Sequence, residues 1–332
     1  MNNTPEKKPF LTMTASPHIK SPVTTQKIML DVLLALLPAV LWSVYVFGTR
    51  CLAIIAVSIL SSVLFEYLYR LVMKKNNTVS DLSSVVTGLL LALTLPSSIP
   101  LWICVIGSFF AIVIVKQLYG GIGKNVVNPA LAARVFLFIA FPKQLTSYPY
   151  PLTKIPTLDS SIDVTAAATP LVQLKNGTLP QDDIISCLLG SIPGTIGEVS
   201  ASLLLLGGLY LIFKKVITWH IPVCYLGTVA ILSLIFPQGN ISGPDFMLYQ
   251  LFTGGLMLGA IFMATDYTTS PVTNKGRIIY AVGCGAITIF IRYFGGYPEG
   301  VSFAILIMNL FVWYLDKLTK PVNFGGAKNA TK

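Results

Sequence analysis

The stretch Ser84-Val-Val-Thr-Gly-Leu-Leu-Leu-Ala-Leu-Thr-Leu-Pro96-Ser-Ser-Ile-Pro100 starts as an apolar run and stops at two prolines. A helix needs about 20 residues to cross the roughly 30 Å hydrocarbon layer of a bilayer. Proline interrupts a helix because it has no amide hydrogen. Irregular backbone at membrane depth is tolerated only where protein or a cavity satisfies its polar groups. The stretch therefore predicts a broken or re-entrant helix buried inside a membrane protein.

A second interruption precedes a short apolar segment at 130–142, and its sequence is Gly120-Gly-Ile-Gly-Lys-Asn-Val-Val-Asn-Pro129. It likewise predicts a broken or re-entrant helix. Apolar segments recur along the rest of the chain. They lie at 28–48, 51–73, 83–99, 100–119, 130–142, 186–213, 219–237, 247–266, 276–295 and 300–318. The pattern predicts an all-α polytopic membrane protein with about ten transmembrane helices, some of them broken.

The composition supports this class. Of 332 residues, 54% are hydrophobic and only 11% are charged, whereas soluble proteins carry about a quarter charged residues. The mean hydropathy is +0.74. The net charge of +10 is explained by the basic cytoplasmic loops of membrane proteins, so nucleic-acid binding is not expected.

The distribution of basic residues predicts the topology. With the N-terminus inside and ten crossings, all but five of the 23 basic residues fall on the inner side. The exceptions are Arg50, Lys143, Lys154, Lys175 and Arg292. This asymmetry is the one that the positive-inside rule requires, and it predicts that both termini are cytoplasmic. Residues 1–27 have no long apolar run, so we expect a cytoplasmic tail and not a signal peptide.

The two halves of the chain resemble each other locally. Thr87-Gly-Leu-Leu-Leu-Ala recurs as Thr253-Gly-Gly-Leu-Met-Leu half a chain length later. Five spans per half would give the halves opposite orientations, so we expect inverted repeats whose broken helices meet near the midplane. The resulting organisation is a cytoplasmic tail (1–27), a first repeat (28–142), an extracytoplasmic loop (143–185), a second repeat (186–318) and a cytoplasmic C-terminal tail (319–332).

Charged residues within apolar segments need partners or a function, because a charge at the bilayer centre costs roughly 2.5–3.5 kcal/mol. Asp31 follows Lys27 by four residues and Glu66 precedes Arg70 by four, so both are expected to form helical i,i+4 pairs. Glu198 lies near the middle of its segment without a basic neighbour in sequence. It is expected either to be buried against a partner helix or to lie near an ion or cofactor path.

The stretch Asp163-Val-Thr-Ala-Ala-Ala-Thr-Pro-Leu171 is a candidate attachment site in the outer loop. Alanines leave the hydroxyl of Thr169 sterically open, and Pro170 restrains the preceding residue to an extended conformation. Such a threonine is able to carry a bulky phosphoester. Alone the stretch also fits an ordinary loop.

The sequence contains no recognisable metal site. The five cysteines stand singly without a CxxC pair, and His18 and His220 are isolated. A zinc site or a complete iron–sulfur ligand set is therefore not expected, and no nucleotide-binding fingerprint is present. Two more polar interruptions, residues 264–271 and 295–300, are either simple turns or parts of a cofactor pocket or gate.

Several motifs together resemble one family. They are the stretch from Ser84 to Pro96, Gly120-Gly-Ile-Gly-Lys-Asn-Val-Val-Asn-Pro-Ala-Leu-Ala-Ala-Arg134, Phe262-Met-Ala-Thr-Asp266, Thr269-Ser-Pro-Val-Thr-Asn-Lys-Gly-Arg277 and Phe294-Gly-Gly-Tyr-Pro-Glu-Gly300. The chain resembles, over nearly its whole length, the RnfD subunit of the Rnf ion-translocating ferredoxin:NAD oxidoreductase complex. RnfD is related to NqrB, a subunit of the sodium-pumping NADH:quinone reductase, and the two define the NqrB/RnfD family.

The resemblance implies a membrane flavoprotein subunit of the bacterial cell membrane. Thr169 matches the threonine that carries FMN in the family, although Ala166 replaces the family's Ser/Thr and only the adjacent Thr165 supplies a hydroxyl. A second, non-covalent flavin, riboflavin, is also implied, with binding residues that the sequence does not locate. The expected partners are the other subunits of a six-subunit complex that moves Na⁺ or H⁺. The chain is expected to relay electrons between ferredoxin and NAD and not to be catalytic alone.

Two other functions fit parts of the sequence. Inverted five-helix repeats also build urea and ammonium channels, but a channel gives no reason for an outer loop with an acceptor threonine. The quinone-reductase relative, NqrB, is disfavoured by the short N-terminal tail, since that relative typically begins with a longer extension.

Overall fold

The computed structural model describes residues 23–152, 167–180, 182–198, 200–239, 241–297 and 299–321. The N-terminal tail to residue 22, most of the outer loop with Lys154, Asp163, Thr165 and Ala166, and the end of the C-terminal tail lie outside these residues. The elements are α1 (Thr25–Phe47), α2 (Thr49–Val72), η1 (Val79–Asp81), α3 (Ser83–Leu93), α4 (Leu101–Phe109), η2 (Phe110–Gln117), α5 (Pro129–Ala140), α6 (Pro142–Leu145), α7 (Pro170–Lys175), α8 (Ile184–Leu189), η3 (Ile196–Glu198), α9 (Ala201–Phe213), α10 (His220–Ile235), α11 (Gly243–Phe252), α12 (Leu256–Leu258), η4 (Gly259–Met263), α13 (Asn274–Phe294) and α14 (Val301–Thr319). Within the described ranges there is no β-strand, and the predicted all-α class is confirmed.

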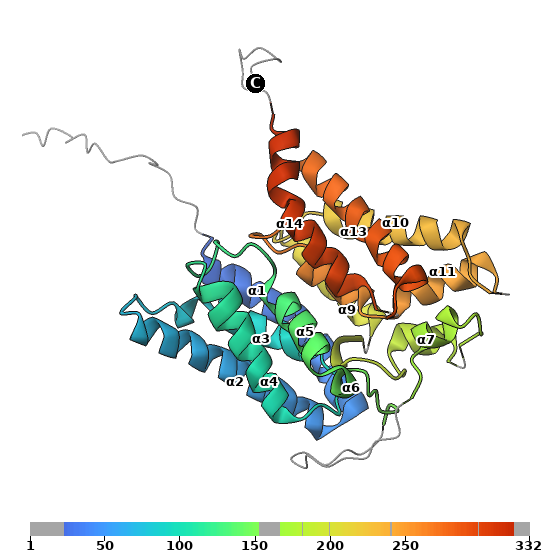
Figure 1. The fold of residues 1–332 in the computed structure, drawn as a ribbon, viewed down its shortest axis with the longest axis horizontal. Helices are drawn as coiled ribbons and strands as arrows, with labels where there is room; N and C mark the ends of the chain where they lie inside the picture. The colour runs from blue at the N-terminus through green and yellow to red at the C-terminus, as the bar shows by residue number, and fades with distance from the viewer. Residues whose placement is uncertain are drawn as a thin grey trace, which may run out of the picture.

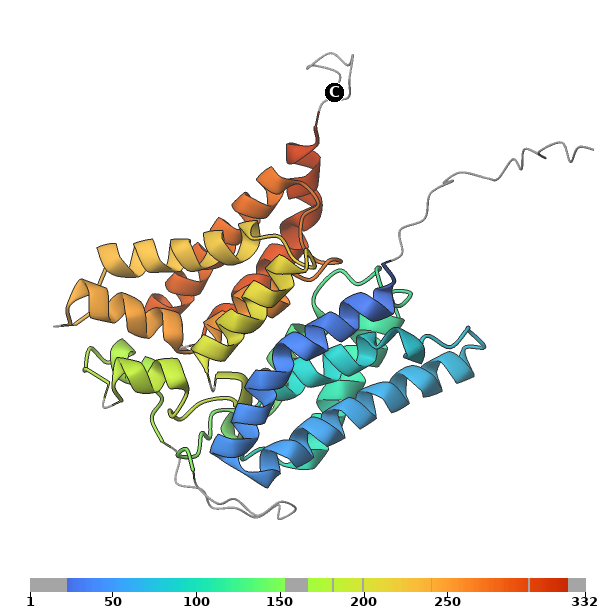
Figure 2. The same cartoon turned by 180° about the vertical axis from the view of Figure 1, so that it is seen from behind.

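The helices form two groups that lie against each other (Figure 1). Helices α1 to α5 make one group and α9 to α14 the other, with α6 and α7 at one end of the molecule. Seen from behind, α1 and α9 run side by side where the groups meet (Figure 2). Gly207 of α9 allows this close approach, because a Cβ there would collide with the carbonyl of Ala35 in α1. Small residues at such crossings let helix backbones pack tightly in membranes.

Among the described residues, four helices, α1, α2, α13 and α14, are long and apolar enough to cross a bilayer. Helix α11 with α12 and η4 is a pair bent by 63°, which is either one broken span or a re-entrant loop. The shorter apolar helices are α3, the continuous α4 and η2, α5, α9 and α10. None of these reaches the length of about 20 residues that a complete crossing needs. The chain is therefore a multi-pass helical protein with at least one broken helix, while the count of ten spans and the inverted repeats stay predictions.

The irregular backbone at the helix breaks has partners within the protein. After α3 ends, the carbonyl of Leu95 accepts a hydrogen bond of 2.9 Å from the amide of Ile196, and Pro96 and Thr195 form an isolated bridge. The guanidinium of Arg50 donates to the carbonyl of Ile99 at 3.0 Å. Because these groups are buried, unpaired backbone here would be costly. The prediction that residues 94–100 form a break buried in protein is thus confirmed.

A second break separates α11 from α12, at Gly254 and Gly255, which both have positive φ angles of 72° and 65°. Glycine adopts this left-handed conformation without the steric cost that other residues carry. The buried Arg292 donates to the carbonyl of Gln250 at 2.6 Å and to that of Thr253 at 3.0 Å. Its positive charge lies at the C-terminal end of α11, where helix carbonyls lack intrahelical partners.

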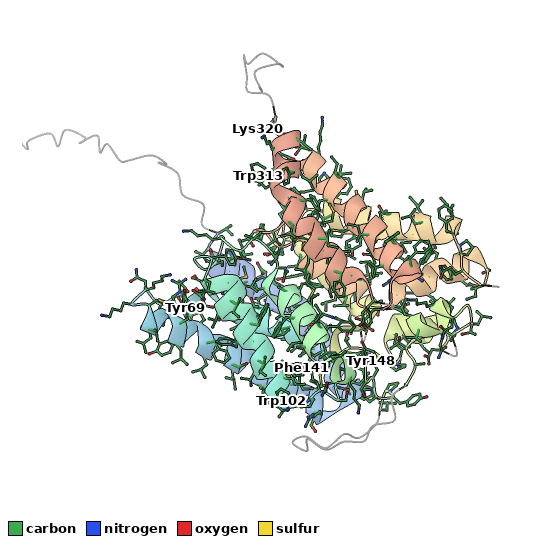
Figure 3. All side chains as sticks on the ribbon, in the orientation of Figure 1. Tyr69, Trp102, Phe141, Tyr148, Trp313 and Lys320 are labelled. Carbon is green, nitrogen blue, oxygen red and sulfur yellow. The ribbon has the colours of Figure 1, made fainter. Side chains whose placement is uncertain are left out.

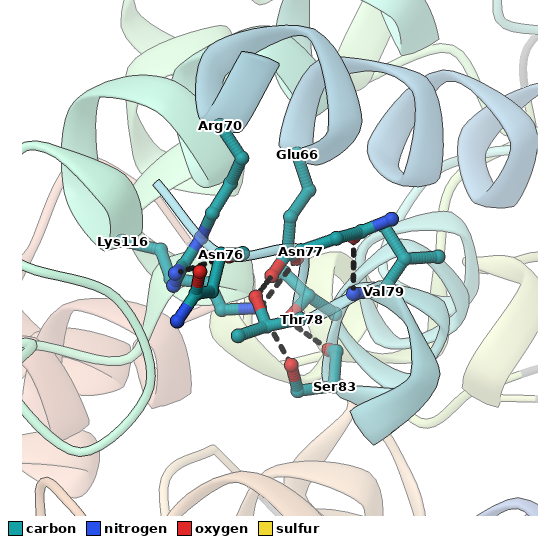
Figure 4. Close-up of polar contacts among 9 residues, drawn as sticks. Glu66, Arg70, Asn76, Asn77, Thr78, Val79, Ser83 and Lys116 are labelled. Carbon is teal, nitrogen blue, oxygen red and sulfur yellow. Dashed lines mark hydrogen bonds and ion pairs between the residues drawn. The ribbon is translucent and has the colours of Figure 1, made fainter. Parts of the chain in front are cut away.

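The two predicted i,i+4 ion pairs are wrong. Asp31 accepts a hydrogen bond of 3.0 Å from the hydroxyl of Tyr210 and does not pair with Lys27. Glu66 pairs instead with Lys116, at 2.8 Å, and also accepts from Thr78. Figure 4 shows this cluster between α2, η1 and η2. An i,i+4 pair on a helix contributes only about 0.2–0.5 kcal/mol. Such a weak preference does not keep Glu66 beside Arg70 when the fold brings the buried Lys116 close to it.

Four basic residues that the topology argument placed in loops lie in helices and are buried. Lys116 and Arg134, counted on the inside, belong to η2 and α5, while Arg50 and Arg292, counted on the outside, belong to α2 and α13. Buried and paired charges carry no information about orientation. Since two residues are removed from each side, the predicted excess of inner basic residues becomes relatively larger.

Replacing Glu66 by glutamine should lower the thermal stability of the purified protein in detergent. Lys116 would keep a charge at 3% side-chain exposure without its counter-ion, and removing one partner of a buried pair typically costs about 3–5 kcal/mol. Asp31→Asn is the control, because asparagine still accepts from Tyr210. Equal melting temperatures of the parent and both variants, measured by fluorescence-detected unfolding, would contradict the importance of the Glu66–Lys116 pair.

Candidate functional site

Thr169 immediately precedes α7 and has the extended conformation that its place before Pro170 predicts, with φ −65° and ψ 153°. Its side chain does not cap the helix, so the hydroxyl is not committed to the amides of α7. The residue is 8% exposed, which is less than the flanking alanines led us to expect, whereas Ala168 beside it is exposed. The hydroxyl thus lies at the edge of a packed segment.

Helix α7 is held by a small apolar cluster at this end of the molecule. Leu171 and Leu174 are buried against Phe246 and Tyr249 of α11, together with Ile192. Burying a leucine side chain typically contributes about 1.5–3 kcal/mol. The cluster therefore fixes the segment on the C-terminal side of Thr169 to the second group of helices.

The part of the outer segment that ends at residue 152 is held by polar contacts. The hydroxyl of Tyr148 donates to Oε1 of Glu299 at 2.7 Å, and Glu299 forms an ion pair with Arg134. The carbonyl of Tyr148 accepts from the amide of Ala167 at 2.9 Å. Figure 3 shows Tyr148 on the same side of the molecule as Trp102 and Phe141, far from Lys320. Arg134, Glu299 and Tyr148 thus join the first helix group, the second and the outer segment.

Glu198 lies in the turn η3 between α8 and α9, and not in the middle of a helix as the sequence suggested. It is 7% exposed, and its Oε1 atom has no hydrogen-bond partner among the described residues. The carboxylate is packed beside Gly194 and Gly255, because a Cβ at either position would contact its oxygens. Buried polar groups without partners are rare and call for an explanation. Glu198 is therefore a buried carboxylate beside the second helix break, with one oxygen that accepts no hydrogen bond from the described residues.

A cavity lies near the start of α1, where Thr25 and Ile28 line it. It measures about 390 Å³ and lies between α1, α3, η2, α9 and the segments around residues 122–130 and 262–268. Polar groups in its wall come from Ser83, Thr87, Lys116, Asn125, Asn128, Thr265, Asp266 and Thr268. Apolar side chains such as Ile28, Met29 and Phe262 line the rest. This volume falls in the range of about 300–1,000 Å³ that is typical of small-molecule sites.

Hydrogen bonds fix the polar wall of this cavity. Asn125 donates from its amide to the hydroxyl of Thr268 at 3.0 Å, and that hydroxyl donates to Oδ2 of Asp266 at 2.9 Å. Asn128 donates to the carbonyl of Met263 at 3.2 Å. The motifs at 120–134 and 262–266, distant in sequence, therefore meet at one site. Both π-helical segments, η2 and η4, border it, and π-helices frequently mark functional sites.

Comparison with known proteins decides the family. The sequence pattern of the NQR2, RnfD, RnfE family matches residues 12–325. The chain belongs to this family. It is 48% identical over 322 residues to the D subunit of a Na⁺-translocating ferredoxin:NAD⁺ oxidoreductase complex from Acetobacterium woodii, and the match covers 96% of both chains.

Other members of the family have related names. The chain is 42% identical to the D subunit of a proton-translocating ferredoxin:NAD⁺ oxidoreductase complex from Clostridium ljungdahlii, with 96% and 97% of the two chains covered. It is 39% identical to the D subunit of an ion-translocating oxidoreductase complex from Stutzerimonas stutzeri, with 91% and 92% covered. The predicted resemblance to the RnfD subunit of the Rnf translocase is confirmed. None of these three names describes a channel.

Some residues of the candidate site were singled out from the sequence and others were not. Thr169, which precedes α7 in the outer segment, and Glu198, which lies in η3 beside the second helix break, were singled out. Tyr148 was not singled out, and its only signal is that a tyrosine follows the short helix α6. The motifs containing Arg134 and Glu299 were recognised, but nothing in sequence indicates that these two residues pair across 165 positions.

The Arg134–Glu299 pair should behave as a coupled unit. Arg134→Met leaves a mostly buried carboxylate unpaired, and Glu299→Gln leaves a mostly buried guanidinium unpaired, so each alone should lower the melting temperature. The double variant buries neither charge. Its melting temperature should be no lower than that of the less stable single variant. Thermal unfolding in detergent measures all four proteins. Strictly additive losses would show that the two residues act independently.

Proposed function

We propose that this chain is the membrane flavoprotein subunit of a six-subunit Rnf complex. In this function it carries FMN on Thr169 through a phosphoester bond, holds riboflavin in the 390 Å³ cavity, and relays electrons between ferredoxin and NAD. The relay is coupled to movement of Na⁺ or H⁺ across the bacterial cell membrane. The main support is the match of nearly the whole chain to the D subunits of such complexes.

The residues around Thr169 fit a covalent flavin. The hydroxyl is free of a capping role, and the exposed Ala168 leaves room on one side of the threonine. Both flanks of the segment are anchored, by Tyr148 on one side and by the α7 leucines on the other. The protein thus supplies position, while the flavin supplies the acceptance and donation of electrons.

The lining of the cavity supports the proposal of a second flavin. Its apolar walls offer contact surface for the fused ring, and Asn125 and Asp266 offer hydrogen-bonding groups for the polar edge of the ring. Lys116 lies in the wall with its charge balanced by Glu66. These side chains would orient the ring and exclude water from it.

The proposed sites lie at opposite ends of α1. Thr25 and Ile28 at its start line the cavity, whereas the carbonyl of Val46 near its end accepts from the amide of Leu152 in the outer segment. A helix of 23 residues is about 34 Å long. Electron tunnelling falls exponentially with distance, so further redox groups are needed between the sites, and we assign them to the other subunits. In the proposed topology the termini and the cavity face the cytoplasm and Thr169 faces outward.

Thr169→Ala should abolish covalent flavin attachment without removing the non-covalent flavin. Parent protein, expressed with the enzyme that attaches FMN, should give a fluorescent band in a denaturing gel, and its Thr169 peptide should gain the mass of FMN less water. Thr165→Ala should keep both signals. A flavin that acid releases from the Thr169→Ala protein would be the occupant of the cavity. A flavin-free Thr169 peptide in the parent would defeat the assignment.

Glu198→Gln should impair ion translocation, because it removes the negative charge from this buried side chain. The Glu198 carboxylate lies at the second break, and one of its oxygens has no hydrogen-bond partner among the described residues. Asp31→Asn, which keeps its contact with Tyr210, should have a smaller effect. The measurement is Na⁺ or H⁺ uptake per electron transferred by the complex in vesicles, at matched protein levels. Unimpaired uptake by both variants would make Glu198 a purely structural residue.

A further inference from the structure

Residues 295–300 form the loop between α13 and α14. This loop contacts the outer segment both before residue 153 and after residue 166. Glu299 of this loop accepts from the hydroxyl of Tyr148. The carbonyl of Gly295 accepts from the ammonium group of Lys175, which ends α7. We call residues 295–300 the docking loop. One short loop thus holds both ends of the segment that contains Thr169.

The Glu299 carboxylate is itself fixed by the first helix group. Arg134, from the middle of α5, forms an ion pair with Glu299. Tyr148 is 8% exposed, so its hydroxyl bond to this charged acceptor is shielded from water. The Tyr148 carbonyl in turn accepts from Ala167. An unbroken series of contacts therefore runs from α5 through the docking loop to the residue two positions before Thr169.

We propose that Tyr148 and Glu299 are positioning residues for the group on Thr169, which they hold in one orientation against the docking loop. The proposal rests on the proposed attachment of FMN to Thr169. The segment after Thr169 is already held by the buried Leu171 and Leu174. Losing the Tyr148 hydroxyl should therefore release the N-terminal flank alone, which changes the orientation and surroundings of the flavin without unfolding the helices.

The test compares Tyr148→Phe with Tyr297→Phe in the purified complex. Tyr297 belongs to the docking loop and is 48% exposed. Its ring packs on Phe138 at 4.7 Å between centroids, a contact that phenylalanine retains. Both changes therefore delete one hydroxyl, but only the first breaks the link to Glu299. The presence of flavin on the Thr169 peptide is first established by mass spectrometry in the parent and both variants.

Three measurements then report on the segment. The anisotropy of covalent-flavin fluorescence reports its freedom, and its midpoint potential reports its surroundings. Maleimide labelling of Ala167→Cys, measured on that peptide, reports opening, because Ala167 is 7% exposed in the closed segment. Tyr148→Phe should lower the anisotropy, shift the potential and raise the labelling rate. The rate should rise about tenfold or more, because losing a hydrogen bond to a charged acceptor changes an equilibrium constant by about that factor. Tyr297→Phe should match the parent.

Each outcome decides the matter. If Tyr148→Phe matches Tyr297→Phe in anisotropy, potential and labelling while Thr169 carries flavin, the positioning role is overturned and the proposed function stands. If the parent carries no flavin on Thr169, the proposed function fails and the positioning of a flavin fails with it. Labelling of Ala167→Cys then still reports whether Tyr148 docks the segment.

Discussion

Backbone polar groups inside a bilayer must be satisfied by the protein, and the two helix breaks show how this chain meets that constraint. At the first break the amide of Ile196 and the carbonyl of Leu95 satisfy each other, so an interruption in one half completes an interruption in the other. At the second break Arg292 serves the carbonyls of Gln250 and Thr253. Because an unpaired buried group costs several kcal/mol in lipid, the first contact fixes η3 against the end of α3, and the second fixes α13 against the end of α11.

The fold also places one ion pair near each of the two proposed sites. Lys116 and Glu66 lie beside the cavity, and Arg134 and Glu299 lie beside the outer segment. Buried ion pairs are weak sources of stability relative to apolar packing but are expensive to break. Their stronger effect is on specificity, since each allows only one relative position of the elements that carry it. Both proposed sites are thus built next to a contact that tolerates little displacement.

The sequence was sufficient for the fold class and the break after α3, because hydropathy and proline act locally. It also identified the family, because motifs such as that containing Asn125 and Asn128 are contiguous. It failed wherever the partner is distant in the chain. Glu66 looked paired with Arg70 but bonds Lys116, fifty positions away. Glu198 looked helical because the apolar run around it is long, whereas the meeting with Leu95 and Pro96 forces a turn there. The burial of Leu171 and Leu174, which follow Thr169, likewise depends on α11, which no local pattern indicates.

The identity of the coupling ion illustrates a different kind of limit. Relatives 48% and 42% identical to this chain are named for Na⁺ and for protons respectively. Both relatives match this chain over 96% of its length, so overall similarity does not separate one name from the other. In the function proposed above, Glu198 suits either ion, because a buried oxygen without a hydrogen-bond partner among the described residues is able to accept a proton or to help ligate a cation.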